Sequence, residues 1–440
     1  MQSVSTIVIG AGIAGLRCAV ALKQAGKSFF LVESGDSVGG RMRTDEVDGF
    51  RLDRGFHVLQ TSYPELDGVV DFAALQITSL EPGAMIRHAG RWARMSDPWR
   101  RPQHAFSTLL NGVGSVSDRW KLMRLRSDAL SSPDFPDPAS INSDGQDRPA
   151  SAWLKQSYGF SDEFIELFLR PWWSGVFLEE KLETSAAFMR FVFKMLSSDT
   201  IAYPAQGIQA IPNQLSTQLP QDSIRLGDSA ENIEVSSECL SVSLSSGEQI
   251  SGERLVLATP MHVSEDLLAP LPKRNVAKRE LSRSHTQTSC LYFSVDVQGT
   301  GLDSLPAREP VLMLNGDRTA GPVNHVFPQS FASKRSAPDG KELMSVNLVG
   351  EQCFASEGEV RAHLSILFGE SARDWSLVRR YDLPHALPAQ PPGFRDQRET
   401  YIYKALDRVV CCGDYVGDAS LNGAMRSGRE AAEWAIGGWG

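Results

Sequence analysis

The stretch TIVIGAGIAG, residues 6–15, decides the fold of this chain. Its first four residues form a short apolar run, as in a strand buried on both faces of a sheet, and glycine then ends the strand. From Ile13 to Ala25 the apolar residues recur with a helical period, and Gly26 stands where a helix would stop. A second apolar run covers residues 28–32. Strand, glycine turn, helix and strand in this order predict a right-handed βαβ unit within a parallel sheet.

Three glycines and one acidic residue in this unit are spaced as in a nucleotide-binding site. Gly10, Gly12 and Gly15 are spaced for a tight turn, close approach of the backbone to a pyrophosphate, and close packing of helix on sheet. Glu33 follows Gly15 by 18 residues, where a carboxylate can accept from both hydroxyls of a ribose and would repel the 2′-phosphate of NADP. A glycine turn that only packs the helix is the simpler alternative. The pattern favours a dinucleotide site at the helix N-terminus.

A glycine pair and an arginine follow in GGRMRT, residues 39–44. Such a loop can bring its backbone close to a phosphate at Gly40 while the Arg41 guanidinium neutralises charge. Composition alone fits an exposed basic loop equally well. The position directly after the βαβ unit favours the phosphate.

The C-terminal segment carries a third candidate motif. Gly413 and Asp414 follow an apolar strand, and SLNGAMRSG occupies residues 420–428. An acid at this place can bond a polyol chain, and a helix starting near Leu421 can direct N–H groups at a developing negative charge. Its small residues would let the helix press against a flat ring or a neighbouring strand. Taken alone, the motif is a helix-packing pattern.

Composition restricts the class of protein. The chain has 440 residues, 42% of them hydrophobic and 22% charged, and a formal net charge of −9. These values indicate a globular protein of at least two packed subdomains, and the acidic balance argues against a nucleic-acid partner. The six cysteines form no C-x-x-C pair and the eight histidines no H-x-x-x-H pair, so we expect a reducing compartment and no metal site. Without a signal-peptide pattern or a long apolar run, we expect a cytoplasmic protein.

The middle of the chain predicts an aromatic helical region and a second sheet. Residues 152–196 are helical in pattern and carry Phe160, Phe164, Phe168, Trp172, Trp173, Phe177, Phe188, Phe191 and Phe193. These rings can line an apolar substrate tunnel or touch a membrane surface, but we expect most of them to be helix core. Residues 233–257 alternate like paired strands, and residues 288–296 and 341–349 alternate like strands of a second sheet. The polar stretch 131–149 predicts an exposed loop.

The three motifs, in this order and at these distances from the two ends, resemble the superfamily of flavin amine oxidases and phytoene desaturases, which includes the protoporphyrinogen oxidases. Six more segments extend the resemblance: DRGFHV (53–58), FLRPWWSGVF (168–177), ETSA (183–186), PAQGI (204–208), VLATP (256–260) and HALP (385–388). The first looks like the family's segment beside the isoalloxazine, and the others look like the desaturase and protoporphyrinogen oxidase branch. The resemblance implies non-covalently bound FAD.

The resemblance also implies roles for individual residues. It places Gly10, Gly12, Gly15, Gly40 and Arg41 at the pyrophosphate, Glu33 at the adenosine ribose, Ala230 on the adenine side, Gly413 and Asp414 at the ribityl chain, Leu421 at the N1–C2 side of the flavin, and Gly55 and Phe56 beside the ring. His57 would lie there too and is the single catalytic candidate, since imidazole titrates near neutrality. A packing role for His57 is the stronger alternative, because hydride abstraction by flavins often needs no protein base.

One departure from the family bears on the substrate. Amine-oxidising members carry a lysine near the flavin N5, and the matching position here is Thr288 or Ser289. Its absence argues against simple monoamine oxidation. Together with the aromatic region, it favours hydride removal from a C–H bond of a bulky apolar small molecule, with oxygen or a quinone as electron acceptor.

We therefore expect an α/β fold of two parts. A Rossmann-like, doubly wound FAD-binding domain would consist of residues 1–70, 200–265 and 400–440. An inserted mixed α+β substrate domain would consist of residues 71–199 and 266–399. The ligand crevice would lie between them.

Two alternatives stay open. An amine or amino-acid oxidase needs a group that recognises the amine or the carboxylate, and Arg87, Arg170 and Arg190 are present without a visible pairing pattern. A non-catalytic prenyl- or lipid-binding protein, like the Rab GDP-dissociation inhibitors on the same fold, would bind no flavin. The Gly413–Asp414 pair and the helix start at Leu421 speak against it. Peripheral contact with a membrane also stays open.

Overall fold

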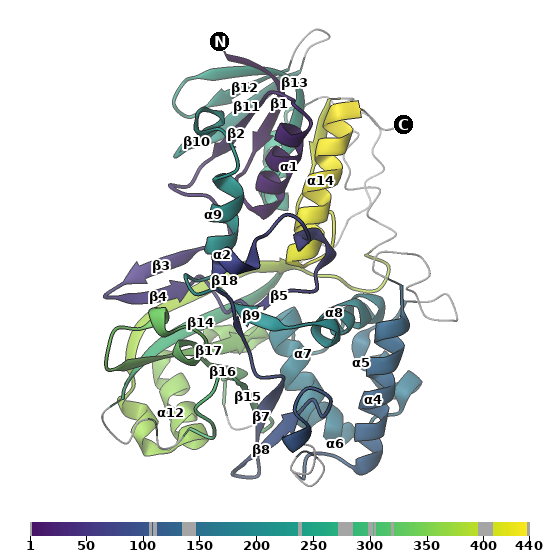
Figure 1. The fold of residues 1–440 in the computed structure, drawn as a ribbon, viewed down its shortest axis with the longest axis vertical. Coiled ribbons are helices and arrows are strands. Elements are labelled where there is room, and N and C mark those ends of the chain that lie inside the picture. Colours follow the sequence, from purple (N-terminus) through teal and green to yellow (C-terminus); the bar gives the residue numbers. More distant parts are fainter. Residues whose placement is uncertain are drawn as a thin grey trace.

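The computed structural model shows two sheets, each with seven strands, at opposite ends of an elongated molecule (Figure 1). It describes residues 2–104, 108, 112–133, 147–235, 240–271, 285–297, 302, 305–317, 321–394 and 408–437. Most of the polar stretch predicted as a loop at 131–149 lies outside these ranges. The mixed α/β fold is the one expected.

The first sheet contains the predicted βαβ unit. Its strands are β1 (Gln2–Ile9), β2 (Phe29–Glu33), β10 (Ile224–Leu226), β11 (Ala230–Val235), β12 (Leu240–Leu244), β13 (Gln249–Leu257) and β19 (Val409–Cys411). They follow the order β10-β2-β1-β13-β12-β11, with β19 beside β13. β1 pairs in parallel with both β2 and β13, and β13 pairs in parallel with β19, so three parts of the chain (residues 2–33, 224–257 and 409–411) build one sheet. Ile7 and Val8 of β1 are fully buried, as expected for a strand covered on both faces.

Helices α1 (Ile13–Gln24) and α14 (Leu421–Gly437) lie side by side on this sheet (Figure 1). Their contact depends on a small residue, because a Cβ added to Gly428 would lie 2.1 Å from the Ala14 carbonyl oxygen. Ser427 closes the other side, where its hydroxyl accepts from the Gly413 N–H at 2.9 Å. These residues of the motif therefore serve contact with α1 and with the turn after β19.

The second sheet crosses the other end of the molecule. Its strands are β7 (Gly83–His88), β8 (Arg91–Ser96), β14 (His285–Asp296), β15 (Leu312–Asn315), β16 (His325–Pro328), β17 (Lys341–Val349) and β18 (Ser376–Pro388). β14 and β17 pair antiparallel, which confirms the predicted second sheet. Both are buried along most of their length rather than on alternate residues, because other elements cover both faces of the sheet.

A helical layer packs beside the second sheet. It consists of α4 (Val116–Ser131), α5 (Ala150–Tyr158), α6 (Asp162–Phe164), the π-helical turn η4 (Ile165–Leu169), α7 (Arg170–Phe177) and α8 (Ala186–Ser198). The helical prediction for residues 152–196 is confirmed, with breaks at Gly159 and Leu178, which both adopt the left-handed conformation that ends a helix. In the part of the chain that the structure describes, no helix is long and apolar enough to cross a membrane.

Shorter elements join these layers. The strands are β3 (Thr44–Val47), β4 (Phe50–Asp53), β5 (Leu59–Gln60), β6 (Thr78–Ser79) and β9 (Ile201–Tyr203). The α-helices are α2 (Phe72–Leu75), α9 (Ala210–Ser216), α10 (Met261–Leu268), α11 (Gln329–Ala332) and α12 (Glu357–Phe368). The 3₁₀ turns are η1 (Pro64–Leu66), η2 (Pro102–His104), η5 (Gln221–Ser223), η8 (Lys334–Ser336), η9 (Gly350–Phe354) and η10 (Glu370–Asp374).

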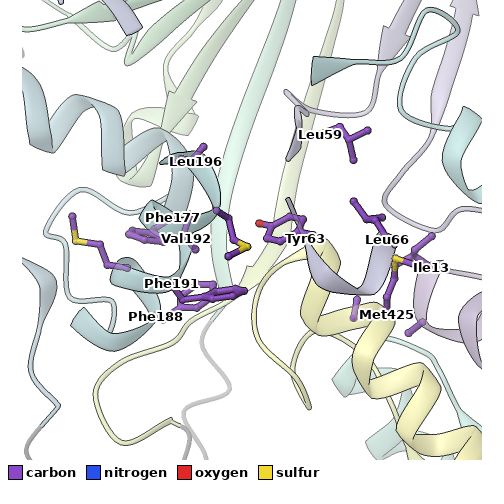
Figure 2. Packing of buried hydrophobic residues seen from close by; sticks show 14 of the residues in the cluster. Ile13, Leu59, Tyr63, Leu66, Phe177, Phe188, Phe191, Val192, Leu196 and Met425 are labelled. Atoms are coloured by element: carbon purple, nitrogen blue, oxygen red, sulfur yellow. The ribbon is translucent and has the colours of Figure 1, made fainter. Parts of the chain in front are cut away.

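The two ends of the molecule share one hydrophobic core. Figure 2 shows Tyr63 between Phe188 and Phe191 of the helical layer on one side and Leu66 and Met425 on the other. The Tyr63 and Phe191 rings stack with their centroids 6.3 Å apart. This shared packing fixes the position of α14 relative to α8. The proposed domain boundaries stay a prediction.

Candidate cofactor and substrate site

One cavity of about 1500 Å³ connects the two ends of the molecule. It begins at the carboxyl ends of β1 and β2, passes the loop at residues 55–58, and continues into the helical layer. Every residue that the sequence predicted for the site lines it except Gly15 and Gly55, which lie beside lining residues. We call the part next to the first sheet the cofactor half and the part in the helical layer the substrate half.

The glycines at the start of α1 have two different roles. An added Cβ would lie 2.6 Å from the Ala258 carbonyl oxygen at Gly10 and 1.9 Å from the Gly10 carbonyl oxygen at Gly15. Gly12 differs, because a Cβ there would meet nothing within 4 Å, and this residue lines the cavity. The fold thus requires Gly10 and Gly15, whereas Gly12 leaves open the space in front of the helix N-terminus.

The N-terminus of α1 is available to an anion. Its N-cap residue, Gly12, has no side chain to satisfy the first N–H groups, and no acidic residue occupies the first turn. Gly12, Ile13 and Ala14 all line the cavity. Backbone donors and the positive end of the helix dipole therefore face a space in which a pyrophosphate fits.

Glu33 is held where β2 ends. One carboxylate oxygen accepts from the Ala11 N–H at 2.7 Å and the other from the Gly35 N–H at 2.8 Å. The Glu33 carbonyl accepts from the Asp228 N–H at 3.1 Å, which brings the start of β11 with Ala230 alongside. The predicted ribose and adenine contacts thus lie at one end of the cofactor half.

Arg41 and Asp414 form an ion pair across the cavity wall. An Nη of Arg41 lies 2.7 Å from the Asp414 carboxylate, and the other donates to the Ala386 carbonyl at 2.7 Å. Asp414 is buried and Arg41 is half-exposed. This arrangement places a guanidinium near Gly40 and a carboxylate after β19, as the resemblance implies for pyrophosphate and ribityl contacts.

The start of α14 is braced by a buried ion pair. An Nη of Arg426 donates to the Asp418 carboxylate at 2.8 Å, and both groups are almost fully buried. The Ser420 hydroxyl also donates to Asp418 and accepts from the Gly423 N–H at 3.0 Å. Leu421, the first residue of the helix, lines the cavity. The helix N-terminus is therefore fixed in a direction that can stabilise negative charge on a bound ring.

His57 lies in the loop between the two halves of the cavity. Its Nδ1 donates to the Gly55 carbonyl at 3.0 Å, which leaves Nε2 as an acceptor. Burial lowers the pKa of His57, and the nearby Asp53 carboxylate only partly offsets this. The imidazole is therefore neutral near pH 7. Gly55 has a φ of +100°, which favours glycine at this turn.

A buried network around Asp53 supports this loop, and sequence reasoning missed it. The Asp53 carboxylate accepts from the Thr44 hydroxyl at 2.6 Å, the Tyr203 hydroxyl at 2.8 Å and the Ile208 N–H at 3.1 Å. Tyr292 donates from β14 to the Asp53 and Gly55 carbonyls at 3.0 and 3.3 Å. Tyr292 and Asp53 are 239 positions apart in the sequence, so a local sequence pattern could not predict this contact.

The substrate half is predominantly apolar. Five of the nine rings in the predicted aromatic region line it: Phe168, Trp172, Phe177, Phe188 and Phe193. Eight of the nine rings, all except Trp172, are buried in the hydrophobic core, so the expectation that most of them are core is confirmed, and the helices also enclose a cavity between them. Trp173 is fully buried and Trp172 faces inward, so neither is placed to touch a membrane surface.

Charged groups in the substrate half are arginines and paired acids. Arg100, Arg119 and Arg126 line the cavity together with Glu81 and Asp97. Glu81 accepts two hydrogen bonds from Arg101, both at 2.9 Å. Asp97 lies between Arg100 and Arg126, at 3.7 and 3.9 Å. Neither carboxylate is available to an ammonium group.

Arg87, Arg170 and Arg190, the arginines considered for recognition of a substrate carboxylate, do not line the cavity. Arg170, for example, binds Glu166 and the Glu180 carbonyl. Thr288 and Ser289 do not face the cavity either, because Ser289 bonds the Asp382 carboxylate at 2.6 Å within the second sheet. Within the described ranges, no lysine lines the cavity and no three His, Cys, Asp or Glu side chains are grouped to hold a metal.

The sequence pattern of the flavin containing amine oxidoreductase family matches residues 13–436. The chain therefore belongs to this family of oxidoreductases. FAD is its cofactor, and the glycines, Glu33 and the two helix N-termini around the cofactor half fit that group.

Matches to individual proteins are either short or of low sequence identity. A 53-residue segment is 47% identical to 4,4'-diapolycopene oxygenase of Methylomonas sp and covers 12% of this chain but only 11% of that protein. An engineered putrescine oxidase superposes with a TM-score of 0.77 at 16% identity over 99% of both chains. A candidate protoporphyrinogen oxidase of Exiguobacterium sp. 255-15 superposes with a TM-score of 0.72 at 17% identity, over 99% of this chain and 98% of that one. At these identities the superpositions show the fold alone.

Replacing Glu33 or Asp414 with alanine should each weaken FAD retention. The first change removes the acceptor at the ribose end, and the second leaves Arg41 without its partner. A lost charge-assisted hydrogen bond costs about 1.5–3 kcal/mol, so the Kd for FAD should rise roughly 10- to 100-fold. Flavin released by acid precipitation measures the effect, with the exposed Glu46→Ala as control. Normal flavin content in both variants would contradict the assignment.

Proposed function

We propose that this enzyme removes a hydride from a C–H bond of a bulky apolar small molecule, while the neighbouring carbon or nitrogen loses a proton to solvent, leaving a C=C or C=N bond. Bound FAD, held without a covalent link, supplies the hydride acceptor. Oxygen or a quinone would then take the electrons. The observation that carries the proposal is the lining of the substrate half, which is mainly aromatic and aliphatic. Its acids pair with arginines, and Ser96, Thr108 and Ser197 are among its few uncharged polar residues.

The protein's own side chains would support this reaction by orienting the substrate and excluding water. The rings of Phe168, Trp172 and Phe193 provide an apolar surface that excludes water and orients a large substrate. The neutral His57 can accept a hydrogen bond at Nε2 but offers no positive charge to the substrate. The N-terminus of α14 is directed at the cofactor half, where it would favour the negative charge of a reduced ring.

Oxidation of an amine is the second candidate, because the family and the superposed putrescine oxidase carry that name. The charges of the substrate half speak against it. An unpaired carboxylate would favour an ammonium substrate, but here both acids pair with arginine, and the three lining arginines would repel the cation.

The decisive experiment is anaerobic titration of the yellow holoprotein. A detergent-dispersed polyene or porphyrinogen should bleach the flavin absorbance, and putrescine or cyclohexylamine should not. Val176→Trp, which fills the substrate half, should slow bleaching by at least about tenfold, since small displacements of a substrate have effects of this size. Val297→Trp, at a 44% exposed position outside the cavity, is the matched control. Bleaching by amines alone would refute the proposal in favour of the second candidate.

A further inference from the structure

Two tryptophans are exposed at the mouth of the substrate half. Trp99 is 53% exposed and Trp120 66% exposed, and both also line the cavity. Val116 is 52% exposed, lies one helical turn before Trp120 on α4, and lines the cavity as well. We call these three residues the rim. Large apolar side chains left in water around the mouth of an apolar cavity indicate a contact surface.

The chain near the rim is basic although the protein is acidic. Residues 97–126 carry two acids, Asp97 and Asp118, against six basic residues: Arg100, Arg101, Arg119, Lys121, Arg124 and Arg126. The chain as a whole has a net charge of −9. Asp118 and Arg119 are both buried, so neither adds much to the surface. Of the other five basic residues, Arg101 pairs with Glu81.

The basic and apolar groups are interleaved rather than separate. The Arg126 guanidinium lies over the Trp99 ring, 5.0 Å from its centroid. Arg124 on α4 is 68% exposed and lies 3.7 Å from the half-exposed Asp128 carboxylate one turn further along the helix. Figure 1 shows α4 at the outer edge of the helical layer, away from the first sheet. The rim therefore presents indole rings beside positive charge at one edge of the molecule.

We propose that the rim docks on an anionic lipid surface. Tryptophan prefers the level of the lipid headgroups, where its ring is apolar and its N–H can still bond, and lysine and arginine are attracted by anionic headgroups. The mouth of the cavity would then open towards the bilayer, and an apolar substrate could enter without crossing water. Only this route of entry rests on the proposed function. The docking itself is independent of any substrate.

The test is cosedimentation of the holoprotein with vesicles. Binding should be strong to vesicles of phosphatidylcholine mixed equally with phosphatidylglycerol, at least about tenfold weaker to phosphatidylcholine alone, and weakened by salt. The double variant Trp99→Ser/Trp120→Ser should lower partitioning by at least about tenfold, since it removes two interfacial anchors. Arg124→Gln should lower it by roughly fivefold, the effect of one basic residue near an anionic surface.

A matched control is available on the second sheet. Phe354, at the end of η9, is 78% exposed and does not line the cavity, so Phe354→Ser should leave partitioning unchanged. No binding to anionic vesicles, or an equal loss in the Phe354 variant, would overturn the proposal. Self-association that depends on the rim, without vesicle binding, would assign this surface to a second copy and overturn it too. Flavin content and bleaching by detergent-dispersed substrate test the proposed function separately.

Discussion

Gly12→Val is expected to give a folded protein whose binding of FAD is strongly weakened. Gly12 has a φ of −66°, which valine adopts without strain, and an added Cβ meets nothing within 4 Å. The cost to the apoprotein should be about 1 kcal/mol, as for an unfavourable helix N-cap residue. The valine methyl groups would occupy the space in front of α1, where a pyrophosphate would contact the backbone N–H groups. We expect the Kd for FAD to rise by at least about a hundredfold.

Fluorescence titration of the apoprotein with FAD measures binding, and urea unfolding of the apoprotein measures stability. Gly358→Val is a matched control, because Gly358 lies at the start of another helix, in the first turn of α12, and the nearest neighbour of its added Cβ would be 3.9 Å away. It should leave FAD binding unchanged. Gly10→Ala should instead fail to fold, since Gly10 has a φ of +103° and its Cβ would lie 2.6 Å from the Ala258 carbonyl oxygen. A Gly12→Val protein with a full complement of FAD would place the phosphates elsewhere.

The cofactor half could be predicted because its information is local. A strand, three glycines, a helix and Glu33 all fall within residues 6–33, and short connections between neighbouring elements leave few possible arrangements. The end of the chain was predictable for the same reason: Asp414 and Leu421 are close in sequence to the strand and helix that position them. Which side chains then contact FAD stays a prediction.

The substrate half could not be predicted in the same way. Its lining residues come from β8, α4, α7, α8 and β16, and their meeting is decided by packing across hundreds of residues. The arginines show the difference. Sequence reasoning singled out Arg87, Arg170 and Arg190, whereas Arg100 and Arg126 line the cavity, and nothing in their immediate sequence separates the two groups. The aromatic region is similar, because its helical pattern is the same whether a ring faces core or cavity.

The two halves depend on one another through the loop at residues 53–57. Asp53 ends β4, His57 lines the cavity, and Tyr292 from β14 bonds the carbonyls of Asp53 and Gly55. Tyr203 from β9 completes the enclosure of the carboxylate. The second sheet therefore helps to hold a turn that faces the cofactor half. This coupling makes Asp53 a position where a single change should strongly lower the stability of the protein.

Asp53→Ala is expected to destabilise the protein by about 3–5 kcal/mol, the cost of breaking a buried, fully bonded polar cluster. Asp53 is 1% exposed, and its removal would leave the Thr44 hydroxyl, the Tyr203 hydroxyl and the Ile208 N–H without their acceptor. Burial raises the pKa of Asp53, and the three donors and the nearby His57 offset that effect in part. The free energy of unfolding in urea, measured at pH 7, checks the prediction.

Asp296→Ala provides the contrast, because its ion pair with Lys341 is just as short, 2.6 Å, but the carboxylate is 68% exposed. An exposed pair of this kind contributes at most about 1 kcal/mol, so this variant should unfold close to the parent. Asp53→Asn keeps one acceptor oxygen, so it should lower the free energy of unfolding by less than Asp53→Ala does. If Asp53→Ala and Asp296→Ala lowered the free energy of unfolding by the same small amount, the Asp53 carboxylate would not hold the loop. Another contact would then have to fix His57 beside the cavity.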